Sequence, residues 1–544
     1  MVEVRPRSHW GRIILTVLFL GGFALRLGRF FENRPLWTDE AKLALGVGRL
    51  GYRGLLHSLD YNQVAPILYL WVMKALTSVF GMHEWVLRLP ALIAGLLMLP
   101  IVWLLCRRII SEAGVIVAVA LTATAPLLIA YSAEAKPYEL DACASAFLLL
   151  LALRVMEHDD QRRRLALGIA GVFAIGFSIP SIFILGGIAA TLVVSAALRR
   201  NSRSAMTMSG WSVAWLAAFS IQRYLARTDA TTDEVMQNFW HGVMIRIGEP
   251  GWGTRLLVSL RAVILSSTDP ALPWLIYFAP FAILLGTLVI WKRAGKSTAS
   301  MLLASLALGL LASSLGLWPI DGRLALFFAP VAFLWMASIA DYVWNAQSYR
   351  TVLRVMIVLL GAVGVLFNVR HPSIFPPLEP SRDLIASIPT QRRSEPVYIV
   401  SGGAPAWVFY TTNWQHPDLA RLTWYARTNS QRTAPSRGHA VSDDEPTLEW
   451  NGADGVELVS RFTGMKFVME HGWATEGPDP NWGNAEMKRL ASRTPGIAWV
   501  FGSHLPASQI DSLREGLKQN GGEMLSEDGG SSSVLWRVRF RPAQ

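Results

Sequence analysis

The chain has 544 residues, of which 52% are hydrophobic and only 16% are charged, and its mean hydropathy is +0.34. A soluble protein of this size would distribute its apolar residues with a strand or helix period of about 2.0 or 3.6 residues. This sequence instead has apolar blocks without Asp, Glu, Lys or Arg, at 113–131, 165–198, 301–317 and 355–367. Because a membrane-spanning helix needs about 20 apolar residues, the composition excludes a soluble globular protein and predicts a mainly α, polytopic membrane protein.

The formal net charge of +11 would also suit a protein that binds nucleic acid. Most of the excess, however, lies in short basic clusters between the apolar blocks. Such clusters mark the cytoplasmic loops of membrane proteins, so we expect no nucleic-acid partner. The clusters are Arg107 and Arg108, then Arg162, Arg163 and Arg164, then Arg199, Arg200 and Arg203, then Lys292, Arg293 and Lys296.

The first apolar segment, 13–27, follows the basic residues Arg5, Arg7 and Arg12 and resembles a signal peptide. No small-residue cleavage site precedes the next charges, so we predict an uncleaved first span. Its basic flank places the N-terminus in the cytoplasm.

A long external loop, 30–85, follows the first span. Its apolar part, 66–80, is short and is interrupted by Lys74. If this part crossed the membrane, Arg107 and Arg108 would lie outside, against the charge rule. We therefore expect an amphipathic helix at the membrane interface instead.

The remaining apolar segments alternate across the membrane so that every basic cluster falls inside. The block 165–198 is too long for one span and contains Pro180, so we expect two spans that turn outside near 178–181. This gives about 11 spans. They are 13–27, 86–106, 113–131, 138–153, the two halves of 165–198, 206–224, 272–291, 301–317, 324–343 and 352–367.

Beyond Asn368 the composition becomes polar, after a linker that contains four prolines. We expect a transmembrane domain at 1–370 and an extracytoplasmic α/β domain at 371–544. The segments 397–400, 499–502 and 534–540 favour strands, and 508–519 favours a helix with Ser508 as its N-cap.

Three external loops carry charged residues next to span ends: 37–40, 132–141 and 318–323. A charge at such a boundary is costly unless it is paired or hydrated, so it indicates function. An acid there could act as a general base, and a base could hold a phosphate. Simpler explanations exist for each group alone: solvated acids, a helix cap at Asp39 and Glu40, or Arg323 as a snorkelling anchor.

The set of loop motifs resembles the GT-C superfamily of lipid-linked glycosyltransferases, most closely glycosyltransferase family 39, which includes protein O-mannosyltransferases and aminoarabinose transferases. The motifs follow the family order over roughly residues 20–335. They are LWTDE at 36–40, DYNQVAP at 60–66, FG-x-x-EW-x-x-RLP at 80–90, AEAKPY at 133–138 and GR at 322–323.

The resemblance implies transfer of a sugar from a polyprenyl phosphate at the outer face of the cell inner membrane, with inversion. It implies Asp39 as general base, supported by Glu40, with Glu134 positioning donor or acceptor. Lys136 and Arg323 would bind the carrier phosphate. Further substrate-binding residues are expected at Gln63, Arg88, Tyr138, Asp141 and Asp321.

Two positions depart from the family pattern. Many relatives have His-Pro-Pro where this chain has Gln63-Val64-Ala65-Pro66, and many have a Lys near 178–181, where this chain has Ser-Ile-Pro-Ser. We therefore expect the phosphate site to use other residues.

The expected partners are the lipid-linked sugar donor, a glycan, lipid or protein acceptor, and membrane lipids. A divalent cation is compatible with the loop acids, since hard cations take several oxygen ligands, but no metal ligand set is expected. A transporter or flippase is the alternative, although its charges would lie at mid-membrane within repeated halves. A membrane-anchored assembly factor would leave the loop motifs unexplained.

Overall fold

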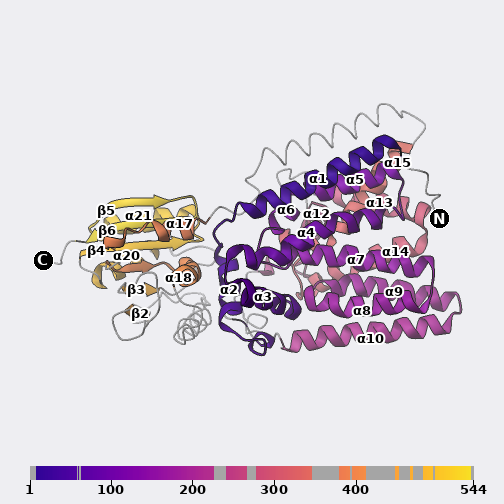
Figure 1. The fold of residues 1–544 in the computed structure, drawn as a ribbon, viewed down its shortest axis with the longest axis horizontal. Coiled ribbons are helices and arrows are strands. Elements are labelled where there is room, and N and C mark those ends of the chain that lie inside the picture. Colours follow the sequence, from indigo (N-terminus) through magenta and orange to yellow (C-terminus); the bar gives the residue numbers. More distant parts are fainter. Residues whose placement is uncertain are drawn as a thin grey trace.

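The computed structural model describes residues 8–57, 59, 63–225, 240–265, 277–345, 379–392, 395–411, 448–451, 466–469, 482–493 and 496–540. A bundle of helices forms the first part, and a six-stranded sheet with its own helices lies beyond one end of the bundle (Figure 1). The predicted span 352–367 and the predicted boundary at 370/371 lie outside the described residues.

The helical part follows the predicted apolar segments. Pro180 separates two helices as expected, because α8 ends at Phe177 and α9 begins at Ser181. The helices are α1 (His9–Phe31), α2 (Thr38–Arg49), α3 (Ile67–Phe80), α4 (Glu84–Cys106), α5 (Glu112–Thr124), α6 (Pro126–Tyr131), α7 (Tyr138–Glu157), α8 (Gln161–Phe177), α9 (Ser181–Leu198), α10 (Ser202–Leu225), α12 (Trp252–Leu265), α13 (Phe278–Ala294), α14 (Lys296–Ser314) and α15 (Ala329–Asn345), with the 3-10 helices η1 (Gly54–Leu56) and η5 (Gly322–Phe328).

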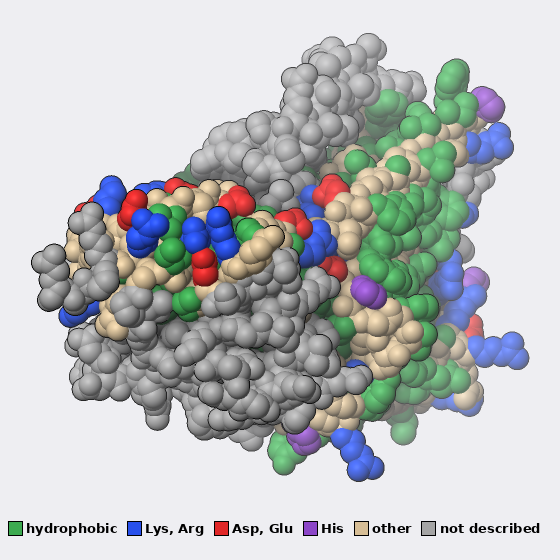
Figure 2. Space-filling model, turned by 60° about the vertical axis from the view of Figure 1, so that its left-hand side comes forward, with side chains coloured by type: hydrophobic (Ala, Val, Ile, Leu, Met, Phe, Trp, Pro, Cys, Tyr) green, Lys and Arg blue, Asp and Glu red, His purple; other side chains and the backbone are tan. Residues whose placement is uncertain are grey.

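The helical part has the surface of a membrane protein. Five described segments are long and apolar enough to cross a bilayer: α1, α4, α9, α14 and the continuous segment Gly322–Asn345. Large apolar side chains such as Leu20, Phe173 and Val213 are more than half exposed. Figure 2 shows hydrophobic side chains over the flank of the helical part, with Lys and Arg gathered at one end. The protein is therefore a multi-pass membrane protein, since soluble monomers rarely expose so large an apolar surface.

The predicted single span 113–131 is wrong in one respect, because it is broken into α5 and α6. Pro126 lacks a backbone N–H and forces the preceding Ala125 out of helical geometry, to φ −60° and ψ 115°. The carbonyl of Thr122, which would have accepted from residue 126, accepts from Arg26 Nη2 at 2.8 Å instead. A buried arginine thus satisfies the backbone group that the proline releases.

Helix α3 has 14 residues, a length of roughly 21 Å, which is less than the ~30 Å of a hydrocarbon core. Lys74, which interrupts its apolar sequence, donates to the carbonyls of Val47 and Gly48 at 2.9 and 3.1 Å. These carbonyls lie in the last turn of α2. Lys74 therefore ties α3 to α2, and the interfacial location of α3 stays a prediction.

The C-terminal region contains a mixed sheet with strand order β2-β3-β1-β4-β6-β5. β1 pairs in parallel with β3 and β4, and β6 pairs antiparallel with β4 and β5. The predicted strands and helix are present, but the Ser508 N-cap is wrong. The helix begins one residue earlier, because the carbonyl of Pro506 already accepts from Gln509 and Ile510. The elements are α17 (Ser381–Ser387), β1 (Val397–Ile399), α18 (Ala404–Thr411), β2 (Leu448–Asn451), β3 (Lys466–Met469), α20 (Trp482–Arg493), β4 (Gly496–Ser503), α21 (Ala507–Gln519), β5 (Gly522–Gly529) and β6 (Ser533–Phe540).

Candidate functional site

The first predicted loop motif forms the start of α2, at the end of the bundle that faces the C-terminal region (Figure 1). Trp37 is the N-cap residue, and Asp39 and Glu40 lie in the first turn. Acids are favoured there by the exposed N–H groups and the helix dipole. The Glu40 side chain is only 1% exposed, whereas that of Asp39 is 18% exposed. The two acids therefore have different surroundings.

Glu40 forms a buried two-fold ion pair with Arg88 of α4. Arg88 Nε and Nη2 donate to the two carboxylate oxygens at 2.9 and 2.7 Å, and the backbone N–H of Ala135 donates at 2.6 Å. Arg88 also donates to the carbonyls of Arg34 and Pro35. Burial alone would raise the pKa of Glu40, but the Arg88 charge and hydrogen bonds hold it below its usual range. This geometry fixes three segments together: the first loop, α4 and the second loop.

Asp39 faces a group of cations. Arg323 Nη2 lies 3.1 Å from its Oδ2, and Lys42 Nζ lies 3.8 Å from its Oδ1. Burial would raise the pKa of Asp39, but the charges of Lys136, Lys42 and Arg323 outweigh it and hold the pKa well below its usual range. The carboxylate is therefore ionised at neutral pH.

Arg323 comes from the third predicted loop, 284 positions from Asp39 in the sequence. Its guanidinium also lies 5.3 Å from the ring centre of Trp37 and 5.5 Å from that of Tyr138. Cation–π contacts of this kind hold a guanidinium in place while leaving its N–H groups available. The first and third loops therefore meet at Asp39 and Arg323.

Glu134 of the second loop is fully buried, and neither of its carboxylate oxygens has a hydrogen-bond partner within the described part of the chain. Burial, and then the charge of Glu40, raise its pKa to about 7. A carboxyl group with a pKa near neutrality can exchange a proton under physiological conditions. Its free oxygens make Glu134 a suitable partner for a hydroxyl group.

Lys136 joins the second loop to the DYNQVAP motif. Its ammonium donates to Gln63 Oε1 at 2.7 Å. Burial lowers its pKa, while the negative charge of Asp39 opposes that effect. Residues 60–62 of the motif lie outside the described residues.

Two expected site residues stand apart from this cluster. Asp141 is buried one turn into α7, and its Oδ1 has no partner among the described residues. Asp321 precedes η5, and burial raises its pKa while the charge of Arg261 from α12 opposes this. Within the described residues, no hydrogen bond or ion pair joins Asp321 to Asp39 or Arg323.

The C-terminal region supplies site neighbours that the sequence did not reveal. Glu379 accepts from the Thr38 N–H at 2.9 Å and from the Thr38 hydroxyl at 3.1 Å. Its other oxygen pairs with His504 Nδ1 at 2.7 Å, and the His504 ring centre lies 6.0 Å from that of Trp37. Contacts between residues so far apart in sequence leave no local pattern. Lys42, in contrast, follows Asp39 by three residues on the same helix, and this spacing could have identified it as a neighbour of Asp39.

In the described ranges, no group of three or more His, Cys, Asp or Glu side chains could hold a metal ion.

One family model matches a segment of this chain. Residues 64–225 match the family model of the dolichyl-phosphate-mannose-protein mannosyltransferases. The predicted resemblance to GT-C lipid-linked glycosyltransferases is confirmed. The matched segment runs from α3 to α10 and includes Arg88, Glu134 and Lys136. No curated protein matches the chain in a sequence search.

Several solved structures are similar to this chain. ArnT from Cupriavidus metallidurans in the apo state is 14% identical, with 97% of both chains covered and a TM-score of 0.47. The same enzyme bound to undecaprenyl phosphate is 13% identical, with 98% of both chains covered and a TM-score of 0.48. The oligosaccharyltransferase AglB from Archaeoglobus fulgidus, with an inhibitory peptide and a dolichol phosphate, is 13% identical. That match covers 97% of this chain and 74% of AglB, with a TM-score of 0.43.

Proposed function

We propose that this protein moves a hexosyl or pentosyl group from a polyprenyl phosphate to an acceptor hydroxyl group, with inversion at the anomeric carbon. One observation carries the proposal: the ionised Asp39 carboxylate lies among Arg323, Lys42 and Lys136. A proton acceptor beside several cations suits attack by a hydroxyl group on a phosphate-linked sugar. The family model matched by residues 64–225 describes enzymes with a dolichyl-phosphate sugar donor, which supports the same chemistry.

In the proposed reaction, Asp39 accepts the proton of the acceptor hydroxyl as its oxygen attacks the anomeric carbon. The bond between that carbon and the phosphate oxygen breaks, and its electron pair leaves with the phosphate. Arg323 and Lys136 stabilise the negative charge that develops on this leaving group. Attack from the face opposite the phosphate inverts the anomeric carbon.

Donor binding would also activate the base. In the free protein, Arg323 pairs with Asp39 and keeps its pKa low, which weakens a carboxylate as a proton acceptor. A bound phosphate competes for the same cations, and their partial transfer to the phosphate raises the pKa of Asp39. The base thus becomes stronger only when the donor is in place.

The other site residues have supporting roles in this proposal. Glu134 accepts a hydrogen bond from a hydroxyl of the sugar or the acceptor, through its unpartnered oxygens. Gln63 orients Lys136, and Tyr138 holds the Arg323 guanidinium. Glu40 and Arg88 position the loops. The acceptor is a glycan, a lipid or a protein.

We further propose that the site faces the periplasm or cell exterior from the plasma membrane, with the N-terminus in the cytoplasm. The basic clusters support this orientation, because they lie at the end of the helices away from the site. The C-terminal region would then be extracytoplasmic.

Transfer by the purified protein tests the function. The full chain in lipid nanodiscs is given polyprenyl-phosphate hexoses and pentoses with glycan, lipid A and peptide acceptors, and the release of free polyprenyl phosphate is measured. Asp39→Asn is expected to lower the transfer rate by about 10²- to 10⁴-fold while the protein still folds. Asp511→Asn, at an exposed ion pair of α21, is the matched control and should transfer normally.

The absence of both binding and transfer with every donor would contradict the proposal. Normal transfer by Asp39→Asn would contradict the role of Asp39. Movement of the intact donor across a vesicle membrane without sugar release would favour the transporter alternative.

A further inference from the structure

A cavity lies at the opposite end of the helices from the candidate site. Its volume is about 910 Å³. The site uses Arg88 and Tyr138 at the starts of α4 and α7, whereas the cavity uses Arg108 and Glu157 at their ends. The 20 residues of α7 span roughly 30 Å, so a membrane thickness separates the two places. We call this cavity the basic-end pocket.

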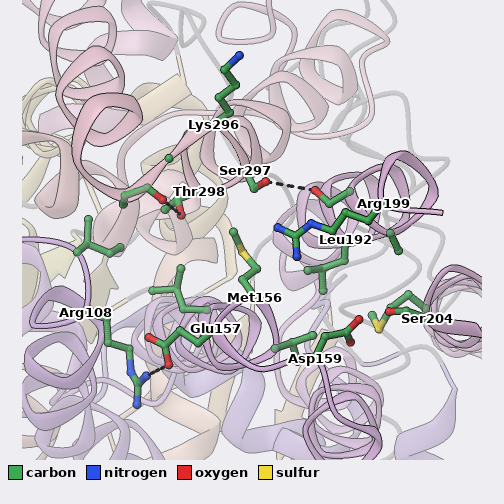
Figure 3. Close-up of a pocket in the computed structure, with 18 of the residues that line it drawn as sticks. Arg108, Met156, Glu157, Asp159, Leu192, Arg199, Ser204, Lys296, Ser297 and Thr298 are labelled. Carbon is green, nitrogen blue, oxygen red and sulfur yellow. Dashed lines mark hydrogen bonds and ion pairs between the residues drawn. The ribbon is translucent and has the colours of Figure 1, made fainter. Parts of the chain in front are cut away.

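Positive charge dominates the walls of the basic-end pocket. Figure 3 shows lining side chains from the ends of α7 and α9 and from the first turn of α14, with the Lys296 ammonium directed away from the middle of the pocket. Two acids line it, but both are already paired: Glu157 with Arg108, and Asp159 with Arg164. The charged lining residues are Arg108, Arg199, Lys292, Arg293, Lys296, Glu157 and Asp159.

Three of these cations have no acidic partner within the described part of the chain. Arg293 pairs with Asp341 of α15, which leaves Arg199, Lys292 and Lys296. Figure 3 shows the Arg199 guanidinium directed toward the middle of the pocket. All three are exposed side chains, and Lys296 Nζ lies 5.7 Å from the ring centre of Trp291. Like charges this close together favour a bound anion.

Neutral groups add hydrogen-bonding capacity next to an apolar wall. The hydroxyls of Ser195 and Ser297 lie 3.3 Å apart in the lining. Deeper in the pocket, Leu192 and Met208 are almost fully buried. On the outside of the adjoining helices, Leu198 and Met206 are 81% and 75% exposed. Polar and positively charged groups thus line the pocket, and the adjoining helices carry exposed apolar side chains.

We propose that the basic-end pocket binds a phosphate ester, supplied by the headgroup of an anionic phospholipid in the leaflet at this end of the protein. The cations match the charge of the phosphate and the serine hydroxyls can donate to its oxygens. The exposed apolar side chains of α9 and α10 would contact the acyl chains. This inference does not depend on sugar transfer, because it concerns the other membrane face and is tested by binding.

Lipid binding to the delipidated full chain in a neutral detergent tests the proposal. The thermal unfolding temperature is followed during titration with phosphatidylglycerol, with phosphatidylcholine, and with inorganic phosphate. We expect phosphatidylglycerol to stabilise the protein more than phosphatidylcholine, and the effect to weaken with salt. The triple variant Arg199→Gln, Lys292→Gln and Lys296→Gln should bind phosphatidylglycerol at least about tenfold more weakly.

A matched control removes the same charge from the same end of the protein outside the pocket. Arg107→Gln, Arg162→Gln and Arg203→Gln are exposed positions and should leave the affinity unchanged. The single variant Arg199→Gln should show a smaller loss, which keeps the test informative if the triple variant folds poorly. Equal affinity of the pocket and control variants, or equal stabilisation by both phospholipids, would overturn the proposal. Stabilisation by inorganic phosphate but by neither phospholipid would show that the pocket binds free phosphate and not a lipid headgroup.

Discussion

Asp39 and Glu40 are neighbours in the first turn of α2, and their different roles follow from helix geometry. Successive residues of an α-helix point about 100° apart. Glu40 therefore turns inward to Arg88, while Asp39 turns toward Arg323. One short motif in this way supplies both a fixed structural carboxylate and a second carboxylate that a substrate could reach.

Glu134 should make the stability of the protein depend on pH. Its pKa of about 7 in the folded protein lies above the value near 4.3 of an unfolded chain. The stability that its protonated form contributes is therefore complete below about pH 4 and is lost as the pH rises through about 7. Glu134→Gln, which cannot ionise, should unfold at a higher temperature than the wild type at about pH 8, and at a similar temperature at about pH 4.

The measurement is thermal unfolding of both proteins in the same detergent across this pH range. Glu515→Gln, an exposed position of α21, is the control and should give no pH-dependent difference. If the Glu134→Gln difference is the same at every pH, Glu134 does not titrate near neutrality.

The Arg88 and Glu40 pair should matter for folding more than for chemistry. Replacing one partner of a buried ion pair leaves an uncompensated charge, at a cost of about 3–5 kcal/mol. Arg88→Leu should therefore lower the unfolding midpoint strongly. Arg88→Lys keeps the charge but cannot donate to two oxygens in parallel, so it should fall between Arg88→Leu and the wild type. Denaturant unfolding in detergent measures both, and wild-type stability of Arg88→Leu would show that the pair is dispensable.

At the scale of elements, the break between α5 and α6 couples two residues that are distant in sequence. Pro126 leaves the Thr122 carbonyl without its helical donor, and Arg26 supplies a replacement. Arg26→Met should therefore be strongly destabilising in the wild type. In a Pro126→Ala background, residue 126 regains an N–H that can bond Thr122, so the same substitution should cost less, by about 1 kcal/mol.

A double-mutant cycle of unfolding free energies measures this coupling. Arg26→Met removes the positive charge near Glu139 both in the wild type and in the Pro126→Ala background. The free energy of that loss therefore cancels from the cycle. Strictly additive effects of the two substitutions would mean that Arg26 does not serve the Thr122 carbonyl.

The sequence predicts the helices well because their formation depends on local properties: an apolar run of sufficient length and a proline at its interruption. The break at Pro126 was missed because the apolar composition continues through it, and composition does not register a lost hydrogen bond. In the site, the charged loop motifs could be recognised in the sequence. A contact between Asp39 and Arg323 could be anticipated because their loops were both predicted on the outer side of the membrane. Glu379 and His504 could not, because their contacts with Thr38 and Trp37 depend on how the C-terminal region docks.

At the scale of the whole molecule, the site lies between two parts of the chain rather than within one. Tyr410 accepts from the Leu36 N–H at 2.8 Å, and Arg382 pairs with Glu84 at the start of α4. With Glu379, these contacts hold the C-terminal region against the loop that carries Asp39. The position of Asp39 therefore depends on residues more than 300 positions away.

The arrangement of charge along the molecule leads to a last prediction, which concerns its orientation. Basic residues gather at one end of the helices, and the candidate site and the C-terminal region lie at the other (Figures 1 and 2). Since basic loops stay in the cytoplasm, Asp511→Cys in α21 should react with a membrane-impermeant maleimide in intact spheroplasts. Arg162→Cys, at the basic end, should react only after permeabilisation.

The two native cysteines provide a low background for this experiment, because Cys106 is buried, Cys143 is partly buried, and both lie within helices. A variant with both replaced by alanine is the control for residual labelling. The reverse labelling pattern would place Asp39 and Arg323 on the cytoplasmic side. A lipid-linked sugar would then have to be used before it crosses the membrane, and the positive charges would face outward against the charge rule. That result would reject the proposed orientation while leaving the contacts between Asp39, Arg323 and the C-terminal region intact.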